Sequence, residues 1–428
     1  MTDHRIDDAV MWRAIGEALE AEDVAHGLPH QWVGVAEYGA SRGADPWPAR
    51  AALVSQRLGC PRDVVPALEA ASAALIEGDD DLRAMFVEWA RADIATAAPL
   101  LAAFTGHGTD VDHPVVLVAD DERAALAAWL SKDQGSPVRV VHAEVIGGGF
   151  SRRMWRVRVA SASIDGQERT VIVRVEQGGM FGTDTAREVA AMQGLRRAGY
   201  RVPEILHVDL AGEALGEPMF VMAVAPGVVR IDDDGLADVI RSVAELHRVP
   251  VGSIDESARD ADQVMHDNID YWLGLYRQHS PIPVPLLEHA AAWLHRELRP
   301  TGPAAVIHGD AGPGNALFDD QEGLTVLDWE FAHVGDPAED WAYLALIRGR
   351  RTMPAEEWKA RILEVANVEL SDEQWHMWLA FNHFRGACVN LTALTVFRNG
   401  PRRTADQLAI GIAVHLRFLG QLLDVMPQ

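Results

Sequence analysis

The chain has 428 residues, of which 48% are hydrophobic and 24% are charged, and this balance excludes a disordered protein. Its 38 Lys and Arg residues stand against 63 Asp and Glu residues, and the resulting formal charge of −25 repels phosphate backbones and argues against nucleic-acid binding. Two cysteines are too few for a disulfide framework or a Cys-rich zinc site, and no apolar run reaches the roughly 20 residues of a membrane span.

The first part of the chain, residues 1–112, is predicted to be helical. Its Ala- and Leu-rich segments have helical periodicity, and Met11, Ile15 and Leu19 recur every four residues. Residues 1–115 hold 19 acidic residues and 8 arginines but contain no motif that carries chemistry. We therefore expect an all-α N-terminal module that docks a protein partner or mediates self-association. A linker is expected at 106–114, where Gly, Asp and Pro occur together.

The rest of the chain changes from a mixed pattern to a helical one. Helices are predicted over 120–132 and 185–197, and β-type runs over 138–146, 154–160, 170–175, 203–208 and 219–224. After about residue 230 the pattern is helical, apart from short β-like runs at 305–307 and 324–327. This order predicts an α+β fold with a strand-rich lobe at 113–225 and a helical lobe at 226–428.

The strongest chemical signal lies in residues 306–344. An apolar run leads into Asp310, Asn315 follows five residues later, and Asp328 stands at the end of the second β-like run. Phosphoryl transfer needs such a set, because one carboxylate must deprotonate the attacking hydroxyl while an amide oxygen and a second carboxylate hold Mg²⁺ on the nucleotide phosphates. A single carboxylate cannot serve both roles, since a bound Mg²⁺ would suppress its basicity.

The segment reads His-Gly-Asp at 308–310, with Asn315 next and Asp-Trp-Glu at 328–330. In this it resembles the aminoglycoside phosphotransferase-like (choline kinase-like) family of the protein kinase fold, over about residues 120–428. The resemblance implies a bilobal kinase-like fold, with a small antiparallel β lobe and a helical lobe. It implies that Asp310 is the catalytic base and that Asn315 and Asp328 are metal ligands. Three further residues are expected to support the loop: His308, Asp336 and Asp340. Glu330 is expected to reach a second metal.

A glycine-rich turn lies between the first two β-type runs. Gly147, Gly148 and Gly149 let backbone N–H groups approach phosphate oxygens, and Ser151 adds a hydroxyl. By itself such a turn is usually an ordinary hairpin. Because it stands about 160 residues before Asp310, as the small lobe of this family requires, we predict that it binds the nucleotide phosphates.

The kinase fold also needs a cation on its third strand, paired with a Glu on the following helix, to clamp the α- and β-phosphates. Arg174 and Glu188 stand at these places. The family often has Lys on this strand, and Arg in its place resembles the acyl-CoA dehydrogenase-associated members. Arg chelates phosphate oxygens in a bidentate manner but is not equivalent to Lys. The alternative is an exposed ion pair without a ligand.

The segment 219–227 resembles the hinge between the two lobes. Backbone groups near Met222 and Val224 would read adenine, and the neighbouring apolar side chains would sandwich the ring. The same residue types also suit an ordinary core strand. The cofactors implied by the resemblance are ATP, with GTP as an open alternative, and Mg²⁺.

The expected partner is a small-molecule acceptor that carries a hydroxyl group. Residues 379–428 contain five arginines and two aspartates, which disfavours a polycationic aminoglycoside. Large aromatic side chains of the helical lobe either fill its core or line an acceptor cleft: Trp272, Trp293, Trp375, Trp378 and Phe381. We therefore expect a neutral or anionic, partly apolar metabolite, such as a hydroxyacyl thioester by analogy with the family.

Other functions fit parts of the pattern. A catalytically inactive, nucleotide-binding scaffold would suit the helical N-terminal module, and an aminoglycoside O-phosphotransferase would share the motif. A metallophosphoesterase would need more histidines than His308 and His333 in this window. The acidic start of the chain lacks the apolar region of a secretory signal. We thus expect a cytoplasmic small-molecule kinase that binds neither nucleic acid nor membrane.

Overall fold

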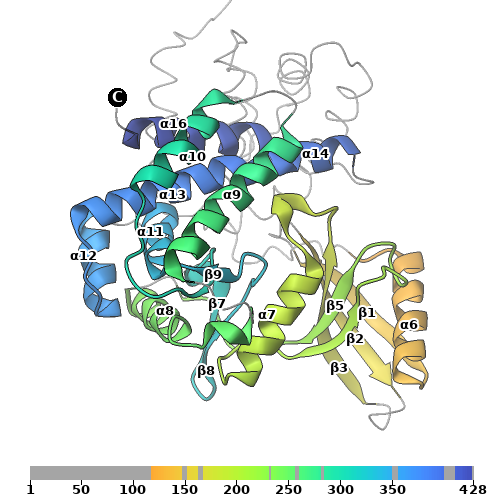
Figure 1. Ribbon diagram of the computed structural model, residues 1–428. Coiled ribbons are helices and arrows are strands. Elements are labelled where there is room, and N and C mark those ends of the chain that lie inside the picture. Colours follow the sequence, from red (N-terminus) through yellow and green to blue (C-terminus); the bar gives the residue numbers. More distant parts are fainter. Residues whose placement is uncertain are drawn as a thin grey trace, which may run out of the picture.

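The computed structural model describes residues 117–146, 152–161, 167–230, 233–255, 260–280, 284–348, 355–399 and 410–426. The predicted N-terminal module at 1–112, the linker at 106–114 and the glycine-rich turn at 147–151 lie outside the described residues. The described chain folds as a β sheet beside a group of helices, as the α+β prediction requires (Figure 1).

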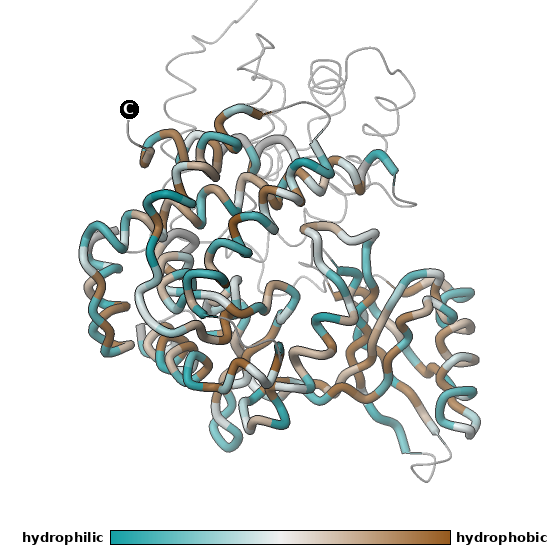
Figure 2. The backbone as a smooth tube through the Cα atoms, in the orientation of Figure 1, coloured by the Kyte–Doolittle hydropathy of each residue, from teal (hydrophilic) through white to brown (hydrophobic). Residues whose placement is uncertain are grey.

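The smaller part is a five-stranded antiparallel sheet. Its strands are β1 (Val138–Ile146), β2 (Arg152–Ser161), β3 (Glu168–Glu176), β4 (Ile205–Asp209) and β5 (Met219–Ala223). They lie in the order β1-β2-β3-β5-β4. Side chains alternate between the two faces, so that Val171, Val173 and Val175 of β3 join one apolar cluster while Ile172 joins another. In Figure 2 these strands show both apolar and polar residues.

Each face of the sheet is covered by one helix. Helix α6 (Asp120–Gln134) buries Leu126 and Leu130 against the first face. Helix α7 (Thr185–Arg197) covers the second face and begins at Asp184, whose carboxylate accepts hydrogen bonds from two backbone N–H groups of the first turn. Gly194 lets the chain at Ser253 approach α7, since a Cβ there would lie 1.8 Å from the Ser253 carbonyl oxygen. These contacts fix α7, and with it Glu188, against the sheet.

The larger part is helical. Its helices are α8 (Asp233–Leu246), α9 (Ala261–His279), α10 (Pro285–Glu297), α11 (Pro337–Arg348), α12 (Ala355–Ala366), α13 (Asp372–Asn390), α14 (Thr392–Asn399) and α16 (His415–Val425), with a π-helical turn at Ile410–Val414. Helix α13 is buried on every side from Ala380 to Asn390, because α9, α10, α11 and α16 pack around it. No helix of the described ranges is both long and apolar enough to cross a bilayer.

Two short two-stranded sheets lie between the larger sheet and the helices. Strand β6 (Ala305–Ile307) pairs with β9 (His333–Gly335), and β7 (Ala316–Asp319) pairs with β8 (Gly323–Val326). Strands β6 and β8 correspond to the predicted runs at 305–307 and 324–327, whereas β7 and β9 were not predicted. The two small sheets carry the segment with the predicted chemistry.

Candidate functional site

The loop that follows β6 is fixed by a buried carboxylate. Asp340 of α11 is fully buried and accepts hydrogen bonds from the backbone N–H groups of His308 at 2.9 Å and Gly309 at 2.8 Å. His247 Nε2 lies 3.0 Å from the same carboxylate. Burial would raise the pKa of Asp340, but the hydrogen bond from His247 and the neighbouring donors hold it below its usual value. These bonds hold the backbone at 308–309 in one conformation, and they thereby fix the position of the next residue, Asp310.

His308 connects this loop to the segment before Asp328. Its Nδ1 accepts from the backbone N–H of Asp310 at 3.2 Å, so Nε2 carries the hydrogen and donates to the carbonyl of Leu327 at 2.9 Å. The side chain is fully buried. His308 therefore holds the backbones of the two predicted acidic residues at a fixed separation, which is a structural role.

Asp310 lies at the end of this loop and is hydrogen-bonded at both carboxylate oxygens. Oδ1 accepts from the Tyr343 hydroxyl at 2.5 Å, and Oδ2 accepts from Asn315 Nδ2 at 3.0 Å. Asn315 Nδ2 also donates to the Asp310 carbonyl at 2.9 Å. Because both partners are acceptors, the amide nitrogen of Asn315 must face Asp310 and its amide oxygen must point away. That oxygen is the atom a divalent cation would bind.

Asp328 lies after β8 in the left-handed region, with φ of 64°. Its Oδ1 accepts from Arg174 Nη2 at 2.8 Å, and 31% of its side-chain surface remains exposed. Partial burial would raise the pKa of Asp328, but the Arg174 guanidinium holds it below its usual range. Asp328 is therefore an anion at neutral pH.

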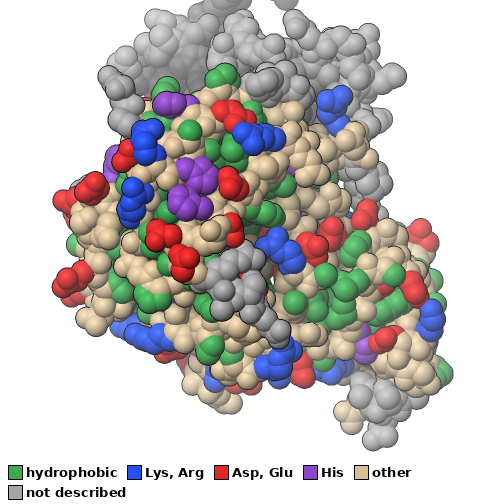
Figure 3. Space-filling view, viewed as in Figure 1, with side chains coloured by type: hydrophobic (Ala, Val, Ile, Leu, Met, Phe, Trp, Pro, Cys, Tyr) green, Lys and Arg blue, Asp and Glu red, His purple; other side chains and the backbone are tan. Residues whose placement is uncertain are grey.

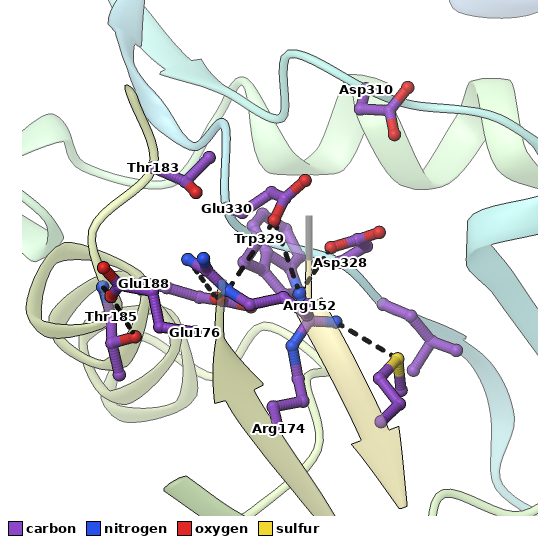
Figure 4. Close-up of polar contacts among 12 residues, drawn as sticks. Arg152, Arg174, Glu176, Thr183, Thr185, Glu188, Asp310, Asp328, Trp329 and Glu330 are labelled. Carbon is purple, nitrogen blue, oxygen red and sulfur yellow. Dashed lines mark hydrogen bonds and ion pairs between the residues drawn. The ribbon is translucent and has the colours of Figure 1, made fainter. Parts of the chain in front are cut away.

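Arg174 and Glu188 form the ion pair that the sequence predicts between β3 and α7. Arg174 Nη2 lies 3.0 Å from Glu188 Oε1 and 3.7 Å from Glu330 Oε2. All three side chains are almost fully buried, which excludes the alternative of an exposed pair. Figure 4 shows these residues converging with Asp328 at one point between the sheet and the helical part.

A second buried cation, Arg152, belongs to the same cluster and was not predicted. Its Nε lies 3.4 Å from Glu188 Oε2 and 3.8 Å from Glu330 Oε2, and its side chain is 1% exposed. The signal was an Arg directly after the glycine-rich turn, at the first residue of β2. Burial and the charge of Asp328 raise the pKa of Glu330 to about 8, in spite of the two arginines. The protonated form of Glu330 is thus favoured more than in an exposed glutamate.

The donor set of this cluster fits a magnesium-bound nucleotide. Asn315 and Asp328 offer an amide and a carboxylate oxygen, the ligand types that Mg²⁺ prefers. Within the described ranges, Arg152 Nη1 and Arg174 Nε are buried without a hydrogen-bond partner. Phosphate oxygens would satisfy such donors. The predicted phosphate-binding residues Gly147, Gly148, Gly149 and Ser151 lie outside the described residues.

The predicted hinge residues lie at the end of β5. Met222 is 7% exposed and packs in the cluster that also contains Trp329, whereas Val224, just past the strand, is 43% exposed. Met222 is thus a core residue as well as a candidate for the adenine site. The backbone contact with adenine stays a prediction.

The structure changes the charge argument for the acceptor region. Arg385, one of the five arginines counted there, is 3% exposed and ion-paired with Glu339 at 2.9 Å. It is a buried structural cation and offers no charge to an acceptor. The predicted aromatics are all buried, and the first of them also lines a cavity: Trp272, Trp293, Trp375, Trp378 and Phe381.

A cavity of about 520 Å³ lies between α7, α9 and the segment 330–334. Trp272 and Phe331 line it together with Glu330, so it reaches the ion-pair cluster from the side of α9. Figure 3 shows acidic, basic and histidine side chains interspersed over the helical part of the viewed face. The cavity is thus a mixed apolar and polar space.

Comparisons with known proteins agree with this geometry. Residues 142–376, more than half of the chain, match the phosphotransferase enzyme family, APH. The sequence is 26% identical over 235 residues to mouse (Mus musculus) acyl-CoA dehydrogenase family member 10, covering 47% of this chain and 22% of that protein. It is 22% identical over 235 residues to family member 11 of Pongo abelii, covering 47% of this chain and 30% of that protein. The chain therefore corresponds to less than a third of either relative.

The same fold is found among solved structures, as in the following example. The choline kinase LicA from Streptococcus pneumoniae superposes with a TM-score of 0.51 at 16% identity, covering 70% of this chain and 98% of that one. At this identity the likeness concerns the fold alone. It confirms the kinase-like fold predicted from the sequence. The family match begins at residue 142 and ends at 376, so it is shorter at both ends than the predicted resemblance.

Proposed function

Because this chain belongs to the phosphotransferase enzyme family, we propose that it transfers the γ-phosphoryl group of ATP to a hydroxyl group of a small molecule. The observation that carries the proposal is the hydrogen bonding around Asp310: Asn315 donates to its carboxylate, and His308 links its backbone to Leu327, the residue before Asp328. A scaffold that binds nucleotide without turnover would not need Asp310 to be oriented at both oxygens.

In the proposed reaction Asp310 orients the acceptor hydroxyl and takes its proton. The hydroxyl oxygen forms a bond to the γ-phosphorus while the bond from that phosphorus to the bridging oxygen breaks, and ADP leaves with the electron pair. Mg²⁺, when bound, would neutralise the charge of the phosphate oxygens. Asn315 and Asp328 would hold it, and Arg174 would orient the phosphates. Positioning and electrostatics supply most of the acceleration.

The acceptor that we propose is a neutral or anionic, partly apolar metabolite. The cavity beside Glu330 combines the aromatic Trp272 and Phe331 with polar groups, which suits a ligand of mixed character. The relatives named acyl-CoA dehydrogenase family members make a hydroxyacyl thioester the first candidate. We also retain the division into segments 1–112, 113–225 and 226–428, with the first as a docking module.

The direct test measures ADP release by the full chain with Mg²⁺ and ATP, first alone and then with hydroxyacyl-CoA thioesters and with aminoglycosides. Asp310→Asn should leave ATP affinity unchanged and lower the rate by about 100- to 10,000-fold, the usual contribution of a general base. Asp319→Asn, in the adjacent hairpin, is the matched control. An unchanged rate in Asp310→Asn would reject the catalytic assignment, and turnover of several aminoglycosides alone would reject the proposed acceptor.

A further inference from the structure

Arg385 occupies a position at which five parts of the helical lobe meet. It lies in the middle of α13 and is 3% exposed. Its Nη1 lies 2.9 Å from Glu339 Oε1, and its Nη2 donates to the carbonyl of Gly309. The guanidinium thus links α13 to α11 and to the loop that carries Asp310.

Three aromatic rings surround the same guanidinium. Its Cζ lies 5.3 Å from the ring centroid of Trp272, 5.1 Å from that of Phe331 and 5.3 Å from that of Tyr343. These rings come from α9, from the segment between β8 and β9, and from α11. Three aromatic faces around one point form an aromatic cage, the arrangement that binds organic cations. Here the chain fills the cage with its own cation.

Two contacts connect this cage to Asp310. The first is the hydrogen bond from Arg385 to the carbonyl of Gly309, the residue before Asp310. Gly309 has φ of 78°, and a Cβ on it would lie 2.8 Å from the Phe331 carbonyl oxygen, so a side chain has no room there. The second is Tyr343, whose ring faces Arg385 while its hydroxyl donates to Asp310 Oδ1 at 2.5 Å. The guanidinium therefore contacts the backbone next to Asp310 directly and the carboxylate of Asp310 through Tyr343.

We propose that Arg385 is a positioning residue for Asp310 and that, by filling the aromatic cage, it keeps cationic acceptor groups out of that cage. The inference rests on the proposed function, since it assigns Asp310 the role of base. It also sharpens the substrate class. An ammonium group could not enter the cage beside Asp310, because the guanidinium already fills the space between the three rings, whereas a neutral or anionic hydroxyl compound has no need of that space.

The test compares the full chain with Arg385→Ala, using Mg²⁺ and ATP. ATP affinity, measured by calorimetry, should stay the same, and the rate of ADP release should fall about a hundredfold, as expected when a catalytic group is slightly displaced. Millimolar guanidinium ion should then restore a large part of the rate, because it can re-enter the cage between the three rings. Urea at the same concentration should not.

Two further variants separate positioning from folding. Arg277→Ala removes an exposed arginine of α9 that pairs with Glu288, so it should keep the parent rate and not respond to guanidinium. Arg385→Lys retains a cation but has one charged nitrogen, so it should give an intermediate rate that guanidinium does not raise. If Arg385→Ala unfolds, the rates of the parent and of Arg385→Lys still test the positioning role. Equal rates in that pair, or no guanidinium rescue in a folded Arg385→Ala, would overturn the positioning role.

The cage itself is tested without catalysis. Guanidinium and choline, a quaternary ammonium alcohol, should raise the melting temperature of Arg385→Ala but not of the parent. If the parent binds ATP without any turnover, the proposed function fails, whereas this thermal shift still reports on the cage. If the parent transfers phosphate to choline, the proposed phosphoryl transfer stands, whereas the proposed acceptor class and the exclusion of cationic acceptors are wrong.

Discussion

Arg174 donates from Nη2 to Asp328 Oδ1 at 2.8 Å, so the cation proposed to hold the phosphates and the acid proposed to hold Mg²⁺ already form one ion pair. The same guanidinium is 3.0 Å from Glu188. Because the two atoms are in direct contact, a magnesium-bound nucleotide in the proposed function would have to bind beside this ion pair or open it.

Replacing Arg174 tests this arrangement. Arg174→Ala would leave Glu188 and Asp328 without their shared cation, and breaking a buried ion pair in this way costs about 3–5 kcal/mol of unfolding free energy. We expect a lower urea midpoint together with a large loss of ATP affinity. Arg174→Lys should retain most of the stability but bind ATP more weakly, because it cannot make a bidentate contact.

The control for this series is again Arg277→Ala, an exposed arginine whose pair with Glu288 contributes little. Equal stability and equal ATP affinity in Arg174→Ala and in the parent would contradict the role of Arg174.

Asp328→Asn tests the metal site. Asp328 has φ of 64°, a conformation that Asn tolerates well, so this variant keeps the backbone and removes the charge. We expect ATP binding to lose its dependence on Mg²⁺, since an amide is a much weaker ligand for this cation than a carboxylate. The measurement is a calorimetric titration of ATP at several Mg²⁺ concentrations. A parent-like magnesium dependence would remove Asp328 from the metal site.

The elements that the sequence predicted well have long patterns of their own. The predicted bounds of α7 and β1 agree with the structure, because thirteen and nine residues contain enough repeats to define a period. Asp310, Asn315 and Asp328 could be named because they lie close together in one short motif. Two of the three are in direct contact, because Asn315 Nδ2 donates to Asp310 Oδ2.

Residues whose roles depend on distant contacts were missed. Arg385 and Gly309 are 76 residues apart, and Arg152 and Glu188 are 36 apart. Nothing in the local sequence distinguishes a buried arginine from an exposed one. Arg385 was therefore counted as a charge of the acceptor region, although Glu339 neutralises it in the core. Whether an arginine is buried depends on its tertiary partners, which leave no pattern in the local sequence.

The acid stability of the fold should depend on Asp340. Its pKa is lowered from 3.8, because the hydrogen bond from His247 and the other donors outweigh the effect of burial. A lowered pKa in the folded state means that the carboxylate stabilises the fold above that ordinary value, and that this contribution is lost as the pH falls through the folded pKa. Urea unfolding of the parent should therefore show a steep loss of stability at acidic pH.

Asp340→Asn isolates this contribution. The amide cannot accept from His247, His308 and Gly309 in the same way, so the variant should be less stable than the parent at neutral pH. Because the titrating group is absent, its unfolding free energy should fall less steeply between neutral pH and pH values below the ordinary value of 3.8. The same change at the exposed Asp262, which is not involved in the loop, should leave the pH profile as in the parent. Parallel profiles for Asp340→Asn and the parent would show that the acid sensitivity arises elsewhere, and Asp340 would then hold the loop by geometry alone.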